Sequence, residues 1–246
     1  MKKLFLLIFI FGFTESDFLK NQKKFQKVKT AYQEKFAKLD ADLKNFDVDI
    51  HSMHLLIVAF KNEQKLELYV RQKEKTVFRK FRNYDICQGS GVLGPKRKQG
   101  DLQVPEGFYY IDHFNPTSNY YLSLGISYPN KSDRIRSGSG DPGGSIFIHG
   151  NCVTIGCMPM TDDKIKEIYV LACQARSSGQ TKIPVYIFPY EMTQTKHKEM
   201  TKDYNNNKLI LNFWDNLKVG YEKFIKSKSE LIYSIDSKGD YIFIGL

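Results

Sequence analysis

Long apolar runs are scarce in this sequence of 246 residues, and that scarcity limits its relation to membranes. The one extended run covers residues 4–13, and ten apolar residues are too few to span a bilayer as a permanent helix. No later stretch is apolar enough to cross a membrane, and the chain contains no internal repeat. We therefore expect no stable membrane span after residue 16. The remaining length suits one well-buried domain with appendages.

The first sixteen residues are predicted to be an export signal. Lys2 and Lys3 precede the apolar run, and Thr14 and Ser16 place small residues before a cut after Ser16. A buried N-terminal helix is the alternative interpretation. No cysteine lies near the cut, so we expect no lipid anchor there. The mature protein is then exported, with the periplasm as its expected location.

The composition favours a folded protein with a basic surface. The sequence is 41% hydrophobic and 14% aromatic, which argues against disorder. Its formal net charge is +10, from 37 basic and 27 acidic residues. Such an excess favours anionic surroundings such as lipid headgroups or acidic cell-wall polymers, although more often than not it is simply a solvated surface. Export argues against nucleic acid as a partner.

Cysteine is sparse, and the count leaves the pairing open. An exported protein with an even number of cysteines suggests disulfides. If one of the four is a catalytic thiol, at most one pair can form. Pairing of Cys87 with Cys152, and a buried free thiol at Cys152, are both open. The four residues are Cys87, Cys152, Cys157 and Cys173.

Residues 17–46 are predicted to form an amphipathic helix. Its apolar residues recur at steps of three and four, which places one stripe along the helix. Packing against the main domain is the favoured interpretation, and a short coiled-coil contact with a partner is the alternative.

From residue 54 onward the period of the pattern changes to that of strands. Two helices and a closing hairpin are also expected, and residues 137–144 read SGSGDPGG, which predicts a loop. The fold class is therefore α+β with an antiparallel-rich core. We assign residues 47–192 to a catalytic domain and residues 193–246 to a C-terminal extension of a helix and a β-hairpin packed on it. Strands are expected at residues 55–60, 66–70, 77–87, 108–113, 120–126, 145–148 and 183–189, helices at 161–173 and 209–224, and the hairpin at 232–244.

The most informative stretch is residues 145–160, SIFIHGNCVTIGCMPM. A predicted strand ends at His149, and Cys157 follows eight positions later. A thiol attacks an amide carbonyl as thiolate, so it needs a base within hydrogen-bond reach. Gly156 leaves the sulfur accessible, and backbone N–H groups near Cys157 could receive an oxyanion. The glycine-rich loop before this stretch could fold over the site and exclude water.

Spacing alone leaves two other interpretations of this stretch. The first is a buried thiol beside a histidine whose hydrogen-bond partners are backbone groups. The second is zinc bound by His149, Cys152 and Cys157. No fourth ligand stands at a familiar spacing, so we expect no metal and no cofactor.

The motifs of the chain add a family resemblance. The sequence Thr154-Ile155-Gly156-Cys157 after a strand ending His-Gly resembles the signature of YkuD-type L,D-transpeptidases, and the wider pattern resembles the YafK branch of that family. The similarity runs from about residue 66 to residue 192. It is carried by Gly94-Pro95-Lys96, Gly100-Asp101, Pro105-Glu106-Gly107-Phe108-Tyr109, Asn115-Pro116, Tyr128-Pro129-Asn130, Ile148-His149-Gly150 and residues 152–160.

The resemblance implies a β-sandwich-like L,D-transpeptidase catalytic domain with peripheral helices. It implies Cys157 as nucleophile, His149 as general base and acid, and the N–H of Gly156 as part of an oxyanion site. The expected substrate is a peptidoglycan stem peptide, attacked at the L-centre of diaminopimelate to give a thioester. Thr154 is a further candidate for substrate binding. From the residues themselves, Arg134 could bind a substrate carboxylate and Tyr109 could line a groove.

Two departures from the family pattern bear on the reaction. The spacing between histidine and cysteine is shorter than in many members, and Pro159 stands where they carry an arginine near the substrate. We therefore rank hydrolysis of the L,D-bond slightly ahead of transfer. Hydrolysis would trim the wall or release wall-linked lipoprotein, whereas transfer would form cross-links or attach protein. A non-catalytic wall-binding protein is the alternative of another class.

Overall fold

The computed structural model describes residues 15–245. The predicted export signal therefore lies outside the described residues, apart from Glu15 and Ser16. Ser16 caps the first helix, and its Oγ lies 2.7 Å from Oγ of Ser177. Within residues 15–245, no helix combines the length and the apolarity that crossing a membrane requires.

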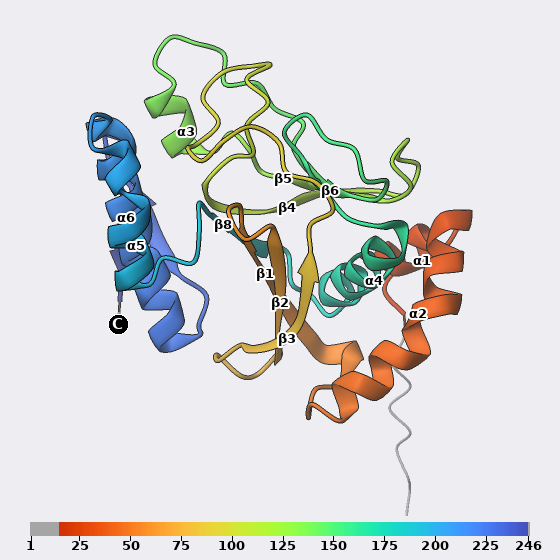
Figure 1. Cartoon of the computed structure of the whole chain (residues 1–246). Helices are drawn as coiled ribbons and strands as arrows, with labels where there is room; N and C mark the ends of the chain where they lie inside the picture. The colour runs from red at the N-terminus through yellow and green to blue at the C-terminus, as the bar shows by residue number, and fades with distance from the viewer. Residues whose placement is uncertain (1–14, 246) are drawn as a thin grey trace, which may run out of the picture.

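One curled sheet of eight strands forms the centre of the fold (Figure 1). The pairs β1–β8 and β6–β7 are parallel and the other neighbours are antiparallel, as the α+β, antiparallel-rich prediction requires. The strand order is β3-β2-β1-β8-β4-β5-β6-β7. The strands are β1 (Met53–Phe60), β2 (Lys65–Gln72), β3 (Arg79–Asp85), β4 (Gly107–Asn115), β5 (Ser123–Ile126), β6 (Phe147–His149), β7 (Met158–Pro159) and β8 (Ile183–Phe188).

Helices cover both faces of the sheet. On one side α4 packs with α1 and α2, and on the other side α6 packs with the C-terminal hairpin (Figure 1). Thr161 caps α4 as predicted. The helices are α1 (Asp17–Gln22), α2 (Gln26–Lys44), α3 (Lys131–Arg136), α4 (Asp162–Ser177), α5 (Gln194–Met200) and α6 (Lys208–Ser227), with short 3₁₀ turns at η1 (Ile50–Ser52) and η2 (Lys202–Tyr204); the hairpin is β9 (Ile232–Ile235) with β10 (Tyr241–Ile244).

The C-terminal extension explains why β2 is buried on both faces. The alternation of this strand predicts that Glu67 and Tyr69 face water, yet they are only 5% and 4% exposed. Tyr69 packs edge-on against Phe224 of α6, with ring centroids 5.2 Å apart, and its hydroxyl donates to Glu67 Oε2 at 2.7 Å. A strand pattern alone could not reveal this second layer, because the residues that cover it come from the far end of the chain.

The N-terminal segment forms two helices where the pattern predicts one. Phe25 adopts an extended backbone and interrupts the helix between α1 and α2. The break lets Phe18 contact the ring of Phe114 at 5.0 Å, while Val28 and Leu43 of α2 are fully buried. In the structure, α4 and the core of the same chain cover this stripe.

Hydrophobic periodicity does not predict the helix α3, because the helix is short and is defined by its N-terminal cap. Asn130 and Asp133 form a reciprocal capping box, with 3.0 Å bonds in both directions. Such a cap satisfies the first N–H groups of a helix without any apolar stripe. Residues 137–144 form no helix or strand, as their composition predicts.

Candidate active site

His149 ends strand β6 and is held in one orientation. Its Nδ1 lies 2.6 Å from the carbonyl oxygen of Gly150, and the ring of Tyr120 stands 4.7 Å away. A carbonyl can only accept, so Nδ1 carries the proton and Nε2 has the free electron pair. The side chain is 3% exposed, and burial lowers the pKa of His149 although the bond to Gly150 opposes the shift. His149 is therefore a neutral imidazole at neutral pH, which is the form of a general base.

Cys157 is presented by a turn that Thr154 closes. The Thr154 Oγ1 accepts the N–H groups of Gly156 at 3.1 Å and of Cys157 at 2.8 Å, and donates to the Cys157 carbonyl at 2.8 Å. The sulfur lies 3.8 Å from the carbonyl oxygen of Ser145. Burial raises the pKa of the Cys157 thiol, against smaller opposing effects of the Phe147 N–H and of Lys96. The resting group is thus a neutral thiol.

The two residues lie at adjacent strands. The parallel register of β6 and β7 pairs Ile148 with Met158 and His149 with Pro159, and Cys157 directly precedes β7. Among the residues that the structure describes, no hydrogen bond joins the imidazole to the thiol. Proton transfer between them therefore needs the two side chains to approach each other or a group that bridges them, and catalytic hydrogen bonds often tighten only when substrate binds.

Gly156 is required by the geometry of this turn. Its φ is +133°, and a Cβ at this position would lie 3.1 Å from the Gln103 carbonyl oxygen. A side chain would thus be strained and crowded against the backbone. Because the Gly156 and Cys157 N–H groups already donate to Thr154, an oxyanion could bind them only by displacing that hydroxyl.

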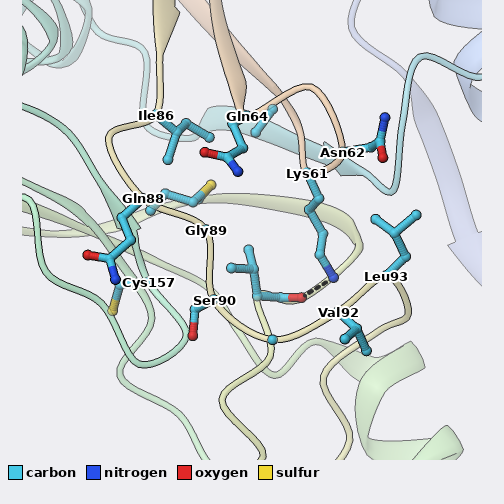
Figure 2. Close-up of a pocket in the computed structure, with 14 residues that line it drawn as sticks. Lys61, Asn62, Gln64, Ile86, Gln88, Gly89, Ser90, Val92, Leu93 and Cys157 are labelled. Carbon is cyan, nitrogen blue, oxygen red and sulfur yellow. Dashed lines mark hydrogen bonds between the residues drawn. The ribbon is translucent and has the colours of Figure 1, made fainter.

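A cavity of about 230 Å³ opens beside the sulfur (Figure 2). Its wall is the segment 88–93, which runs from Gln88 to Leu93, and Cys157 and Met158 line another side. Lys61 closes its base, because the Nζ donates to the carbonyls of Gly94 at 2.7 Å and Val104 at 2.9 Å.

Glu106 anchors this wall from the protein interior. Its side chain is fully buried, and Oε1 accepts from Lys61 Nζ at 2.9 Å and from the Gly94 N–H at 2.8 Å. Oε2 accepts from Trp214 Nε1 of α6 at 2.8 Å. Sequence reasoning quoted Glu106 within a motif without assigning it a role. The signal in the sequence was a single carboxylate directly before the strand β4. A charge that is buried with such a strand is normally paired, so a buried cationic partner could have been expected.

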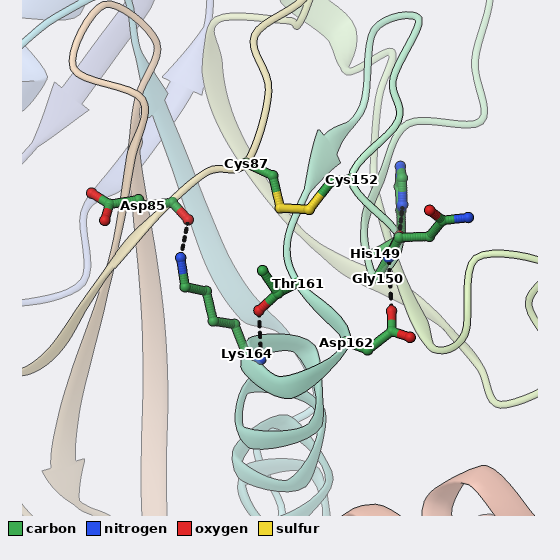
Figure 3. Close-up of a disulfide and its surroundings, with 9 residues drawn as sticks. Asp85, Cys87, His149, Gly150, Cys152, Thr161, Asp162 and Lys164 are labelled. Atoms are coloured by element: carbon green, nitrogen blue, oxygen red, sulfur yellow. Dashed lines mark hydrogen bonds between the residues drawn. A yellow bond between two sulfur atoms is a disulfide. The ribbon is translucent and has the colours of Figure 1, made fainter.

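A disulfide joins the two segments that border the cavity (Figure 3). Cys87, which directly precedes the segment 88–93, is bonded to Cys152, which lies between His149 and Cys157 in the sequence. The Cys87 N–H also donates to the Pro159 carbonyl at 2.9 Å. Cys152 is therefore not available as a zinc ligand, and residues 15–245 contain no group of three or more histidine, cysteine or acidic side chains that could hold a metal. Cys157 and the buried Cys173 are the free thiols.

The remaining candidates lie away from the sulfur. Arg134 is exposed on α3 and does not line the cavity. Tyr109 is 3% exposed, and its hydroxyl lies 3.0 Å from both the Glu106 carbonyl and Asp133 Oδ2, so it belongs to the core. Thr154 adjoins Cys157 but is engaged with the backbone of the turn.

A curled, mostly antiparallel sheet brings the free Cys157 to a cavity and carries the buried His149 on the neighbouring strand, which defines a candidate cysteine enzyme. His149 itself is not among the residues that line the cavity. Residues 54–187 match the YkuD family, the L,D-transpeptidase catalytic domain. The chain belongs to this L,D-transpeptidase family. The matched residues lie within the predicted catalytic domain of residues 47–192.

The chain is similar to YafK from Escherichia coli strain K12 and from strain O157:H7, whose name assigns it to the L,D-transpeptidases. Each comparison shows 37% identity over 194 residues, covering 78% of this chain and 75% of YafK. Among solved structures, Pgp2, a helical cell shape determining protein from Campylobacter jejuni, is 19% identical with a TM-score of 0.44, covering 74% of this chain and 73% of Pgp2.

Proposed function

We propose that this chain is an exported cysteine enzyme that cleaves peptidoglycan stem peptides at the L,D-bond of diaminopimelate, with Cys157 as nucleophile and His149 as base. The observation that carries the proposal is the position of Cys157. It is the free thiol that lines the cavity, since Cys87 and Cys152 are bonded to each other and Cys173 is fully buried. A wall-binding module would need no free thiol in a cavity next to the strand that carries a neutral imidazole.

The first half of the reaction forms an acyl-enzyme. His149 Nε2 accepts the thiol proton, and Sγ of Cys157 attacks the carbonyl carbon of the L-centre. The C–N bond then breaks, and the departing amine takes the proton from His149. The acyl group remains on sulfur as a thioester. Both partners start neutral, so the proton moves as the C–S bond forms, and no charged pair has to exist beforehand.

The second half releases the acyl group. Water, deprotonated by His149, attacks the thioester, the C–S bond breaks, and the proton returns to the sulfur. An amine acceptor in place of water would give a cross-link or a protein attachment. We favour water slightly, because Pro159 is buried in β7 and offers no cation where many family members carry arginine. Wall-linked lipoprotein is one substrate whose release this chemistry would accomplish.

Export to the periplasm is supported by the disulfide. Disulfides persist in oxidising compartments and are rare in the cytosol. The bond between Cys87 and Cys152 closes a loop of 65 residues around the site, which suits a protein that works outside the cytoplasm. The peptidoglycan substrate is found in the same place.

The decisive experiment is incubation of Cys157→Ala with purified muropeptides, with products followed by mass. The variant should give no product and should retain the unfolding transition of the unmodified protein, because nothing nearby replaces the thiol. Cys173→Ala is the matched control, and it should retain turnover. Product formation by Cys157→Ala at the rate of the unmodified protein would refute the cysteine mechanism. Retained wall binding without turnover in the unmodified protein would favour a non-catalytic role.

A further inference from the structure

We propose that the C-terminal extension completes a carboxylate-binding subsite for the stem peptide, in a groove that continues from the Cys157 cavity. This inference rests on the proposed function for the identity of its ligand. The groove has a volume of about 540 Å³ and shares Val92 and Leu93 with the Cys157 cavity, where Figure 2 shows both side chains. Its far wall consists of the first turn of α6 and the hairpin turn at Lys238, which lie outside the family match of residues 54–187.

The size of the Cys157 cavity alone is the first argument. Sites for small ligands usually measure roughly 300–1,000 Å³. The cavity at the sulfur, at about 230 Å³, falls below that range and can take little more than the scissile unit. The groove lies within the range and adjoins the cavity at Val92 and Leu93, so it has room for the rest of a peptide substrate.

The groove also reaches the nucleophile from another direction. Gln103 lines it, and the Gln103 carbonyl lies 3.1 Å from the place of a Cβ on Gly156. The Oε1 of Gln103 accepts the Val92 N–H at 3.1 Å, which fixes the shared wall to the same residue. A ligand in the groove is therefore separated from the turn of Gly156 and Cys157 by Gln103.

Charge indicates what the groove would hold. The cations that line it are Arg97, Arg136 and Lys238, and the carboxylates that face the two arginines are Asp133 and Asp240. Lys238 in turn lies near Asp236, so three carboxylates balance the three cations. None of these carboxylates lines the groove, however, so the charged groups that a ligand meets there are the cations, which attract an anion. Arginine presents several donors in a fixed fork that suits a carboxylate.

Both guanidinium groups keep donors for a ligand. Arg97 Nη1 donates to Asp133 at 2.8 Å, while its buried Nη2 has no hydrogen-bond partner among residues 15–245. Arg136 uses Nε on the Gly239 carbonyl at 3.2 Å and Nη2 on Asp240. Each guanidinium lies 4.9 Å from the ring centre of Phe213, which holds the two groups together at the start of α6.

The apolar part of the groove restricts the ligand further. Leu209 is 80% exposed, and Ile210 and Phe213 extend its wall. An exposed leucine beside paired arginines suits a peptide that carries carboxylates on short aliphatic side chains, as a stem peptide does. The occupant is thus the carboxylate-bearing part of the stem peptide outside the scissile unit.

The test uses Cys157→Ala protein, which cannot turn the ligand over, titrated by calorimetry with a synthetic stem tetrapeptide and with its fully amidated analogue. We expect the acid to bind about tenfold more tightly than the amide, equivalent to about 1.4 kcal/mol. Adding Leu209→Glu should weaken binding of the acid about tenfold more than binding of the amide, because the new carboxylate repels only the acid. Leu209→Gln separates the effect of charge from loss of the apolar side chain.

Val219→Glu is the matched control, because it introduces the same charge at an exposed position of the same helix outside the groove. It should bind both peptides as the Cys157→Ala parent does. The proposal that the groove binds carboxylates would be overturned by any of three results: equal binding of acid and amide, no binding of either, or equal weakening by Leu209→Glu and Val219→Glu. Failure of the catalytic proposal shows separately, as absence of products from the unmodified protein.

Discussion

The hydroxyl of Thr154 bridges the backbone N–H and the backbone carbonyl of Cys157, accepting from the first and donating to the second, both at 2.8 Å. One side chain thus fixes the orientation of the residue that carries the sulfur. It also occupies the N–H groups from which the sequence predicts an oxyanion site. The geometry of this turn therefore depends on the hydroxyl.

Thr154→Ala should lower kcat by about ten- to a hundredfold, since small displacements of a reacting group are costly. The free energy of unfolding should fall by about 1–3 kcal/mol, because the part-buried N–H groups of Gly156 and Cys157 lose their hydrogen-bond acceptor. Thr154→Ser keeps the hydroxyl and should retain most of the activity. Steady-state kinetics and thermal unfolding of the three proteins separate the two effects. An unchanged kcat in Thr154→Ala would show that the turn holds its shape without the hydroxyl.

The disulfide leads to a prediction about stability and activity together. Closing a loop of 65 residues stabilises the folded state by about 4 kcal/mol on a chain-entropy estimate. The double variant Cys87→Ala, Cys152→Ala should therefore unfold at a lower temperature. It should also lose activity at temperatures where it is still folded, because the segment 88–93 is no longer tied to the catalytic turn. Full activity in the folded double variant would limit the bond to a stabilising role.

Thiol counting checks the pairing independently. Iodoacetamide should label one thiol, Cys157, in the folded unreduced protein, because Cys173 is fully buried. Unfolding without reductant should expose two thiols, and unfolding with reductant should expose four, as mass spectrometry would record. Four labelled thiols without reductant would contradict the disulfide.

The pKa shifts of the two candidate catalytic residues predict the pH dependence. Burial lowers the pKa of His149, so the base form persists below pH 6.5, and the acid limb of kcat/KM should lie below that value. Burial raises the pKa of Cys157, so alkylation of the free enzyme should keep rising with pH beyond 9.0. Rates measured between pH 4 and 10 would show both limbs. A thiol that alkylates fully at pH 7 would mean that a preformed ion pair exists.

The elements of this fold that obey local rules were predictable. The cap of α4 at Thr161, the hairpin of β9 and β10, and the loop at residues 137–144 all follow from residues within a few positions of one another. The break at Phe25 was not predictable, because the helical period continues across it and its consequence is a contact between Phe18 and the distant Phe114. Periodicity carries no information about a contact so distant in sequence.

The residues of the candidate site also fall into those that a local motif indicates and those that depend on distant contacts. Cys157, His149 and Gly156 were found because they share one motif. Glu106 was missed as a functional residue because its partners Lys61 and Trp214 come from opposite ends of the chain. Arg134 was chosen for its place before the glycine-rich loop, but helix α3 turns Arg136, two residues later, towards the groove.

Pro159 leads to a prediction about the outcome of the reaction. It lies buried on the edge strand β7, opposite His149, and its carbonyl accepts the N–H of Cys87. A proline is tolerated there because an edge strand needs no further N–H donor. With defined muropeptides and excess amine acceptor, hydrolysis products should therefore outnumber transfer products, since no cation stands at this position to bind the donor.

Replacing Pro159 tests whether that missing cation decides between water and an amine. An arginine contact to a carboxylate in a shielded site contributes on the order of 1.5–3 kcal/mol, enough to raise the share of transfer. Pro159→Arg should therefore increase the ratio of transfer to hydrolysis, and Pro159→Ala should not, although both lose the ring that stiffens β7. Equal ratios in the two variants would assign any change to the backbone. Predominant cross-linking by the unmodified protein would contradict the inference from Pro159 and leave the roles of Cys157 and His149 intact, because both products pass through the same thioester.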